Sequence, residues 1–198
     1  MRALVVYCHP RAASFTAAVR DVVLQRLGQT GAEVRICDLY ALGFDPVLSA
    51  RALDAYEDPA RNRAGLEPEI ADLQWCDTLI FVYPTWWYGL PAMLKGWLDR
   101  VMVPGVAFEM PMPGQTIRPG LGHIARLGVF TTCGASWWLT RWIGAPGKRT
   151  LLRGLRLLCA RRCRTGFAAL YLMDSASPEA RKRHLIRVGA RLDALLRP

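Results

Sequence analysis

Three large aromatic side chains follow a short apolar run in the middle of the chain. The run Leu79–Tyr83 is rich in strand formers and too short for a helix, which predicts a strand buried on both faces. Pro84 is expected to end the ladder, and Trp86, Trp87 and Tyr88 follow it. Flat rings at the carboxyl end of a parallel strand form a platform for a planar ligand. The alternative is that one or two of the rings pack beneath the loop.

The amino terminus offers a second chemical feature. Ala3–Cys8 reads as another buried strand, and His9 opens a short loop that ends at Ser14. Ser14 is placed as the N-cap of a helix near residues 14–28, whose first turn holds Thr16. Unpaired amides and the helix dipole make such a terminus a phosphate site. The alternative is an ordinary capped helix that binds nothing.

Strands and helices alternate along the chain, which predicts a doubly wound parallel α/β sheet. The expected strands are Ala3–Cys8, Glu33–Asp38, Thr78–Tyr83, Ile124–Thr131 and Gly166–Leu172. The expected helices lie near residues 14–28, 66–75, 91–102, 148–160 and 178–196. In the common five-stranded order 2-1-3-4-5, the first and third strands lie side by side at the switch point where ligands bind. Both chemical features therefore fall on one crevice.

Composition indicates one soluble domain over residues 1–198. The chain is 52% hydrophobic and contains no run of about 20 apolar residues that could span a membrane. Its six cysteines are scattered without a CxxC pair and there are three histidines, so we expect no metal site and a reducing cytoplasm.

The basic charge is concentrated at the carboxyl end. Residues 1–147 carry 13 basic and 13 acidic side chains, whereas residues 148–198 carry 13 basic and 3 acidic ones. The simplest interpretation is a pair of solvated basic helix faces. The alternatives are attraction of an anionic substrate, or contact with an acidic partner or membrane surface. Nucleic acid is not among the expected partners.

The order of motifs over about residues 1–134 resembles the NAD(P)H:quinone oxidoreductase family of flavodoxin-fold flavoproteins. The motifs are His9 with Ser14, Phe15 and Thr16, the acidic segment Asp38–Pro46, the loop Pro84–Pro91 with the LKGWLDRV helix after it, and Thr131–Gly134. The resemblance implies a tightly held FAD or FMN, NAD(P)H as the reductant, a quinone or similar acceptor, and a homodimer.

The resemblance also assigns roles to residues. The flavin phosphates would lie against His9, Ser14, Phe15 and Thr16, and the ring along Pro84, Thr85, Trp86, Trp87 and Tyr88. Thr131, Thr132, Cys133 and Gly134 would face its N1 and O2 edge. Trp87 would wall the slot that nicotinamide and acceptor share in turn, and Phe108 and Met110 would cover that slot, from the same chain or from a second subunit.

The chain departs from the family after this loop. Well-known members carry a Tyr and a His there, whereas this chain has no Tyr or His between Thr132 and Leu170, so we name no catalytic acid or base. Cys133 replaces a loop glycine, so the loop must differ locally if that position needs a positive φ. The Trp-rich segment Trp137–Trp142 could be pocket wall, dimer contact or partner surface, and we expect at least one of its rings to lie in the interior.

Two other functions stay open from the sequence. One is a flavodoxin-like electron carrier, which the lack of a strongly acidic surface disfavours. The other is an ancillary or regulatory subunit of a membrane transporter, docked through the basic carboxyl-terminal region.

Overall fold

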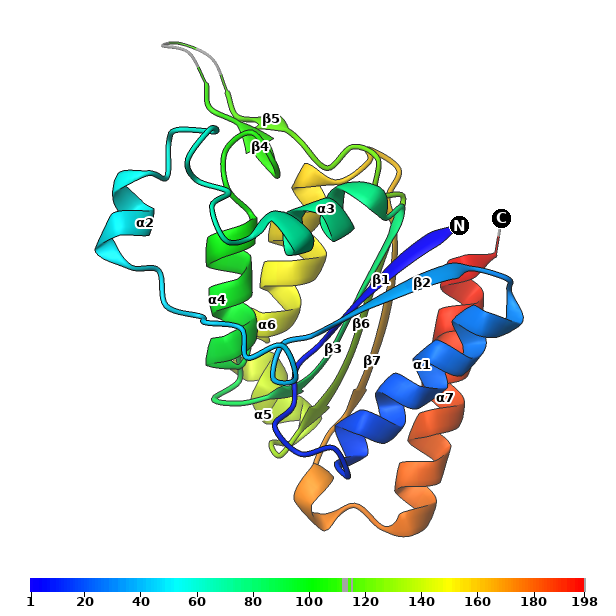
Figure 1. Cartoon of the computed structure of the whole chain (residues 1–198). Helices are drawn as coiled ribbons and strands as arrows, with labels where there is room; N and C mark the ends of the chain where they lie inside the picture. The colour runs from blue at the N-terminus through cyan, green and yellow to red at the C-terminus, as the bar shows by residue number, and fades with distance from the viewer. Residues whose placement is uncertain (112–113, 115, 198) are drawn as a thin grey trace.

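The computed structural model describes residues 1–111, 114 and 116–197 as a parallel sheet with helices on both faces (Figure 1). The strands are β1 (Arg2–Tyr7), β2 (Glu33–Asp38), β3 (Thr78–Thr85), β4 (Phe108–Glu109), β5 (Arg118–Pro119), β6 (Arg126–Cys133) and β7 (Arg164–Leu170). The main sheet has the order β2-β1-β3-β6-β7, and all its neighbours are parallel. This confirms the predicted flavodoxin-like fold, with β1 and β3 adjacent at the switch point.

The helices divide between the two faces of the sheet. They are α1 (Phe15–Gln29), α2 (Ala50–Asp54), α3 (Glu67–Trp75), α4 (Ala92–Val101), α5 (Trp137–Trp142), α6 (Pro146–Arg149) and α7 (Pro178–Leu196). Helices α1 and α7 cover one face, where Val19, Val23, Val188 and Leu192 pack on the strands. Helices α3 and α4 and the segment around Leu151 cover the other face (Figure 1). Burial of strands on both sides explains their continuous apolar runs.

A glycine pair lets the last helix approach the sheet closely. Gly128 of β6 and Gly166 of β7 are register partners, and a Cβ atom on either would come within 3.3 Å of the Leu195 side chain. Helix α7 can therefore lie directly on the β6–β7 pair.

Three predicted details of the elements were wrong. Pro84 does not end the ladder, since β3 continues to Thr85 and Pro84 is the register partner of Thr132. Strands β6 and β7 each begin and end two residues away from the predicted bounds. The predicted helix 148–160 is irregular: α6 continues into a π-helical turn, Thr150–Gly154, and a 3-10 turn, Leu155–Leu158. Glycine at 154, a weak helix former, lies where the last two meet.

Several small elements lie outside the predicted set. The two-stranded hairpin β4–β5 and the short helices α2 and α5 were not predicted. Among the helices of the described residues, none combines the length and apolarity needed to cross a bilayer.

Candidate functional site

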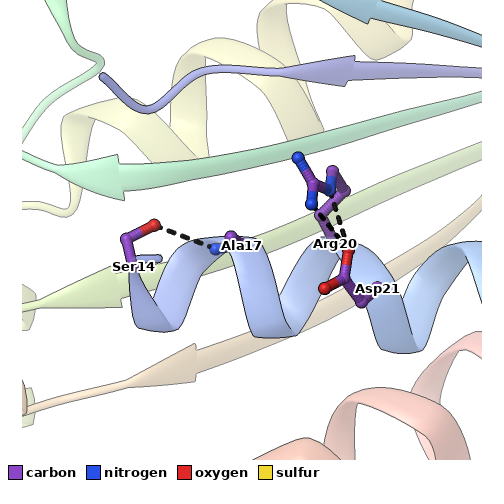
Figure 2. Close-up of polar contacts among 4 residues, drawn as sticks. All are labelled: Ser14, Ala17, Arg20 and Asp21. Atoms are coloured by element: carbon purple, nitrogen blue, oxygen red, sulfur yellow. Dashed lines mark hydrogen bonds and ion pairs between the residues drawn. The ribbon is translucent and has the colours of Figure 1, made fainter. Parts of the chain in front are cut away.

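The amino terminus of helix α1 lies at the carboxyl end of β1. Ser14 caps it, and no acidic side chain in the first turn offsets the positive end of its dipole. The Ser14 hydroxyl accepts a hydrogen bond of 3.0 Å from the Ala17 amide, as predicted for an N-cap (Figure 2). The first turn holds no acidic side chain, and Arg20 and Asp21 in the next turn bind each other at 2.8 Å. Because the first turn carries no carboxylate of its own, its dipole is available to an anion.

His9 is held in one orientation beside this terminus. Its Nδ1 atom lies 3.0 Å from the Arg11 amide nitrogen, which can donate to it, and 3.2 Å from the Arg11 carbonyl oxygen. Partial burial lowers the pKa of His9, an effect that the Arg11 charge reinforces. The ring lies 6.3 Å from that of Trp86. His9 therefore links the loop after β1 to the loop after β3.

The three aromatic residues form a tight turn at the end of β3. Trp86 and Gly89 pair across the turn, and the Gly89 amide donates to the Trp86 carbonyl at 3.0 Å. The two central residues, Trp87 and Tyr88, have φ of 46° and 62°. Left-handed backbone at a bulky residue costs about 1–3 kcal/mol, and such strain concentrates at binding sites. The turn leaves the Trp87 ring 94% exposed, so the predicted platform is open on one side.

Threonine hydroxyls tie the third loop to the other two. Thr85 of β3 and Thr131 of β6 share a hydrogen bond of 2.8 Å, and Thr16 of α1 lies 3.5 Å from Thr132. Cys133 ends strand β6 and is absent from the positive-φ residues of the described chain, so cysteine at this position carries no backbone strain.

These segments enclose a cavity of about 700 Å³ at the carboxyl ends of the strands. Its walls contain the following predicted site residues: His9, Phe15, Thr16, Pro84, Thr85, Trp86, Trp87, Tyr88, Thr132, Cys133 and Gly134. Ser14 and Thr131 do not line the cavity. The Ser14 hydroxyl caps helix α1, and the Thr131 hydroxyl shares a hydrogen bond with that of Thr85. Two independent sequence features thus meet in one cavity.

Phe108 and Met110 do not line this cavity. Helix α4 carries the chain back from the carboxyl ends of the strands, and the β4–β5 hairpin lies at the opposite end of the sheet (Figure 1). Phe108 packs on the core there and Met110 is exposed. They cannot cover the cavity of their own chain.

Sequence reasoning missed three residues of the cavity wall, Ala135, Met173 and Asp174. Asp174 follows β7, and a Cβ atom on Gly134 would lie 2.6 Å from its Oδ2 atom. Only a glycine lets this carboxylate lie where it does. Its position in the sequence could have indicated this, because the carboxyl ends of all the parallel strands meet at the edge of the sheet where the cavity lies.

The interior position predicted for the Trp-rich segment was wrong. Helix α5 begins after Ser136, whose hydroxyl accepts from the Leu139 amide. The exposed fractions of Trp137, Trp138 and Trp142 are 45%, 74% and 85%. A helix of six residues on the surface buries few side chains, so these rings form an open apolar face.

Comparisons with known proteins agree with this architecture. Residues 1–191 match the model of the family described as "Flavodoxin-like fold". The chain is 35% identical over 123 residues to NAD(P)H dehydrogenase [quinone] 1 of Cavia porcellus, covering 54% of this chain and 45% of that protein. It is 32% identical over 126 residues to ribosyldihydronicotinamide dehydrogenase [quinone] of Pongo abelii, covering 56% and 54%. The chain thus spans about half the length of the curated relatives it matches.

A solved structure aligns over nearly the whole chain. The NAD(P)H:quinone oxidoreductase from Methanothermobacter marburgensis has a TM-score of 0.79 and 25% identity, over 100% of this chain and 98% of that one. The chain belongs to the family described as "Flavodoxin-like fold".

Proposed function

We propose that this chain is a flavin-dependent NAD(P)H oxidoreductase whose acceptor is a quinone or a similar planar molecule. The observation that carries the proposal is the cavity of about 700 Å³, in which an aromatic turn faces a helix amino terminus. That volume suits a cofactor-sized ligand. A ring needs a flat apolar wall and a phosphate needs unpaired donors, and the cavity offers both.

The residues present fit a flavin at each of its parts. The His9 ring lies in the same cavity wall as the first turn of α1, and the ring and the amides of that turn would hold the phosphate. The turn at Trp86–Tyr88 would support the ring, and the donors of Thr132 and Gly134 would meet its polar edge. FAD and FMN share these parts.

A bound flavin supplies the redox chemistry, accepting a hydride from NAD(P)H and passing reducing equivalents to the acceptor. The protein's contribution is position. The exposed Trp87 ring would wall a slot wide enough for one planar reactant at a time, so that nicotinamide and acceptor use it in turn.

We propose that the working form is a homodimer. Phe108 and Met110 lie at the far end of the sheet, so they can cover only the cavity of a second copy. The open face of Trp138 and Trp142 also favours a covered state, because contiguous apolar patches mark interaction surfaces. Sedimentation velocity at micromolar protein should give a dimer mass, and a monomer would remove this part of the proposal.

Steady-state kinetics test the activity. The flavin-loaded protein should oxidise NAD(P)H with a soluble quinone, and double-reciprocal plots should give parallel lines because both reactants use one slot. Intersecting lines would contradict the shared slot. Flavin binding without any NAD(P)H oxidation would contradict the enzyme and favour an electron carrier.

A further inference from the structure

A second cavity, of about 350 Å³, lies beside the first, between α5, α6 and β7. A small apolar pocket of about 20 Å³ lies between the two. It shares Thr85 and Cys133 with the first cavity, and Thr140 and Lys148 with the second. The second cavity therefore borders the candidate site on the side of β7, the edge strand of the sheet.

The wall of this second cavity carries four cations: Arg141, Lys148, Arg149 and Arg153. No carboxylate lines it, and the sequence has no Asp or Glu between Glu109 and Asp174. Across the described ranges, none of the four side chains makes a hydrogen bond or an ion pair. Four like charges without a counter-charge in one concavity create a strongly positive local potential.

The positions of these cations are built into the fold. Arg149 lies against the backbone of Gly144, since a Cβ atom there would come within 3.1 Å of its Nη1 atom. Gly144 has φ of 99°, a conformation that glycine adopts without strain. Lys148 lies 4.3 Å from the centre of the Phe167 ring. The glycine thus makes room for a guanidinium at the cavity wall.

One aromatic ring accompanies the cations. Trp137 is about half exposed on the cavity wall, and Arg141 lies 5.8 Å from its ring centre. An indole face next to phosphate-binding cations is the combination that holds a nucleotide, with the base stacked on the ring and the phosphate among the cations.

We propose that this basic cavity binds the adenosine end of NADPH, with the 2′-phosphate among Arg141, Lys148, Arg149 and Arg153. The inference rests on the proposed function, because it has nicotinamide at the Trp87 slot. Strand β6 alone separates β3 from β7, and the two cavities border the same small pocket, so the proposal has one dinucleotide reach from the Trp87 slot to the basic cavity. These cations attract a phosphate monoester dianion most strongly. NADPH carries such a group at its 2′ position and NADH does not, so the cavity selects NADPH.

Calorimetric titration with adenosine 2′,5′-bisphosphate tests the cavity without any turnover. The double variant R149Q/R153Q should raise its Kd at least 10-fold, and Trp137→Ala should raise it several-fold. The matched control is R161Q/R162Q, which removes two exposed arginines of the same acid-free stretch that line neither cavity. Adenosine 5′-monophosphate, which lacks the 2′-phosphate, should bind at least 10-fold more weakly to the unaltered protein.

Kinetics then connect the cavity to the cofactor. In R149Q/R153Q the KM for NADPH should rise about 10-fold while the KM for NADH stays unchanged. Equal losses in R149Q/R153Q and R161Q/R162Q, or equal affinity for the two adenosine nucleotides, would overturn the inference. If the bisphosphate binds as expected but the protein takes up no flavin, the cavity stands as a nucleotide site and the proposed oxidoreductase function fails.

Discussion

Two tryptophans ten residues apart have opposite environments. Trp97 in α4 is fully buried, and its ring meets that of Phe81 edge-on at 6.0 Å. Trp87, in the turn before α4, is 94% exposed on left-handed backbone. One aromatic-rich stretch therefore supplies both the core beneath the sheet and the wall of the cavity. The strained backbone is that of Trp87 at the cavity wall, where the exposed ring does not stabilise the fold.

The largest expected effect is the loss of stability when the buried Trp97 ring is removed. Trp97→Ala should lower the free energy of unfolding by about 3–5 kcal/mol, because a large cavity opens in the core. Urea denaturation followed by circular dichroism measures the change. Trp87→Ala is the matched control and should unfold within about 0.5 kcal/mol of the unaltered protein; equal losses in the two variants would erase the distinction.

The buried ring of His184, on the opposite face of the sheet, predicts a pH-dependent stability. His184 in α7 is buried beside Phe15, and its ring nitrogens lack hydrogen-bond partners in the part of the chain that is described. Burial, with the Arg187 charge, lowers its pKa to about 4. The unfolded chain then binds the proton at a pKa near 6.5, so stability is full above that pH and falls as the pH drops toward 4.

The loss assigned to His184 by pH 4 is about 3 kcal/mol. Unfolding free energies of the unaltered protein and His184→Leu, measured from pH 7 to 4, should diverge in pH dependence by about that amount. Identical pH profiles would show that His184 titrates normally in the folded state.

Smaller effects distinguish a cap that serves a site from one that does not. Ser14 and Ser177 cap α1 and α7 with the same type of bond. Each Ser→Ala change should cost about 1 kcal/mol of stability in thermal unfolding. Only Ser14→Ala should also weaken flavin binding, by a few-fold, because the amides of α1 face the cavity. Equal flavin affinity in both variants would remove α1 from the site.

The smallest expected effect is on stability at the exposed Trp87. Asn accepts left-handed backbone more readily than Trp, so Trp87→Asn should leave stability unchanged or raise it by up to about 1 kcal/mol. Flavin affinity should fall in the same variant. A clear loss of stability in chemical denaturation would mean that the Trp87 ring packs on the protein.

The sequence predicted what depends on local pattern. Apolar runs and caps located β1, β3, α1 and α7, and the common order of five-stranded doubly wound sheets predicted the strand order. The convergence of His9, Thr16 and Trp87 on one cavity followed from that order.

The missed features depend on tertiary context. Nothing local marks Asp174 as a neighbour of Gly134, because the two meet only when β6 and β7 pair. Pro84 continues a strand because its missing amide leaves the pairing with β6 intact. The rings of α5 read as core by composition, yet a six-residue surface helix has no room to bury them.

Titration of FMN and of FAD with the purified protein, followed by flavin fluorescence, tests the central claim most directly. The cavity predicts saturable binding at micromolar concentrations or below, and a loss of about 1 kcal/mol or more in Trp87→Ala, from removal of the stacking ring. Trp97→Phe, which retains a buried ring, should keep full affinity wherever it folds. Folded protein that binds neither flavin at micromolar concentrations would contradict the account.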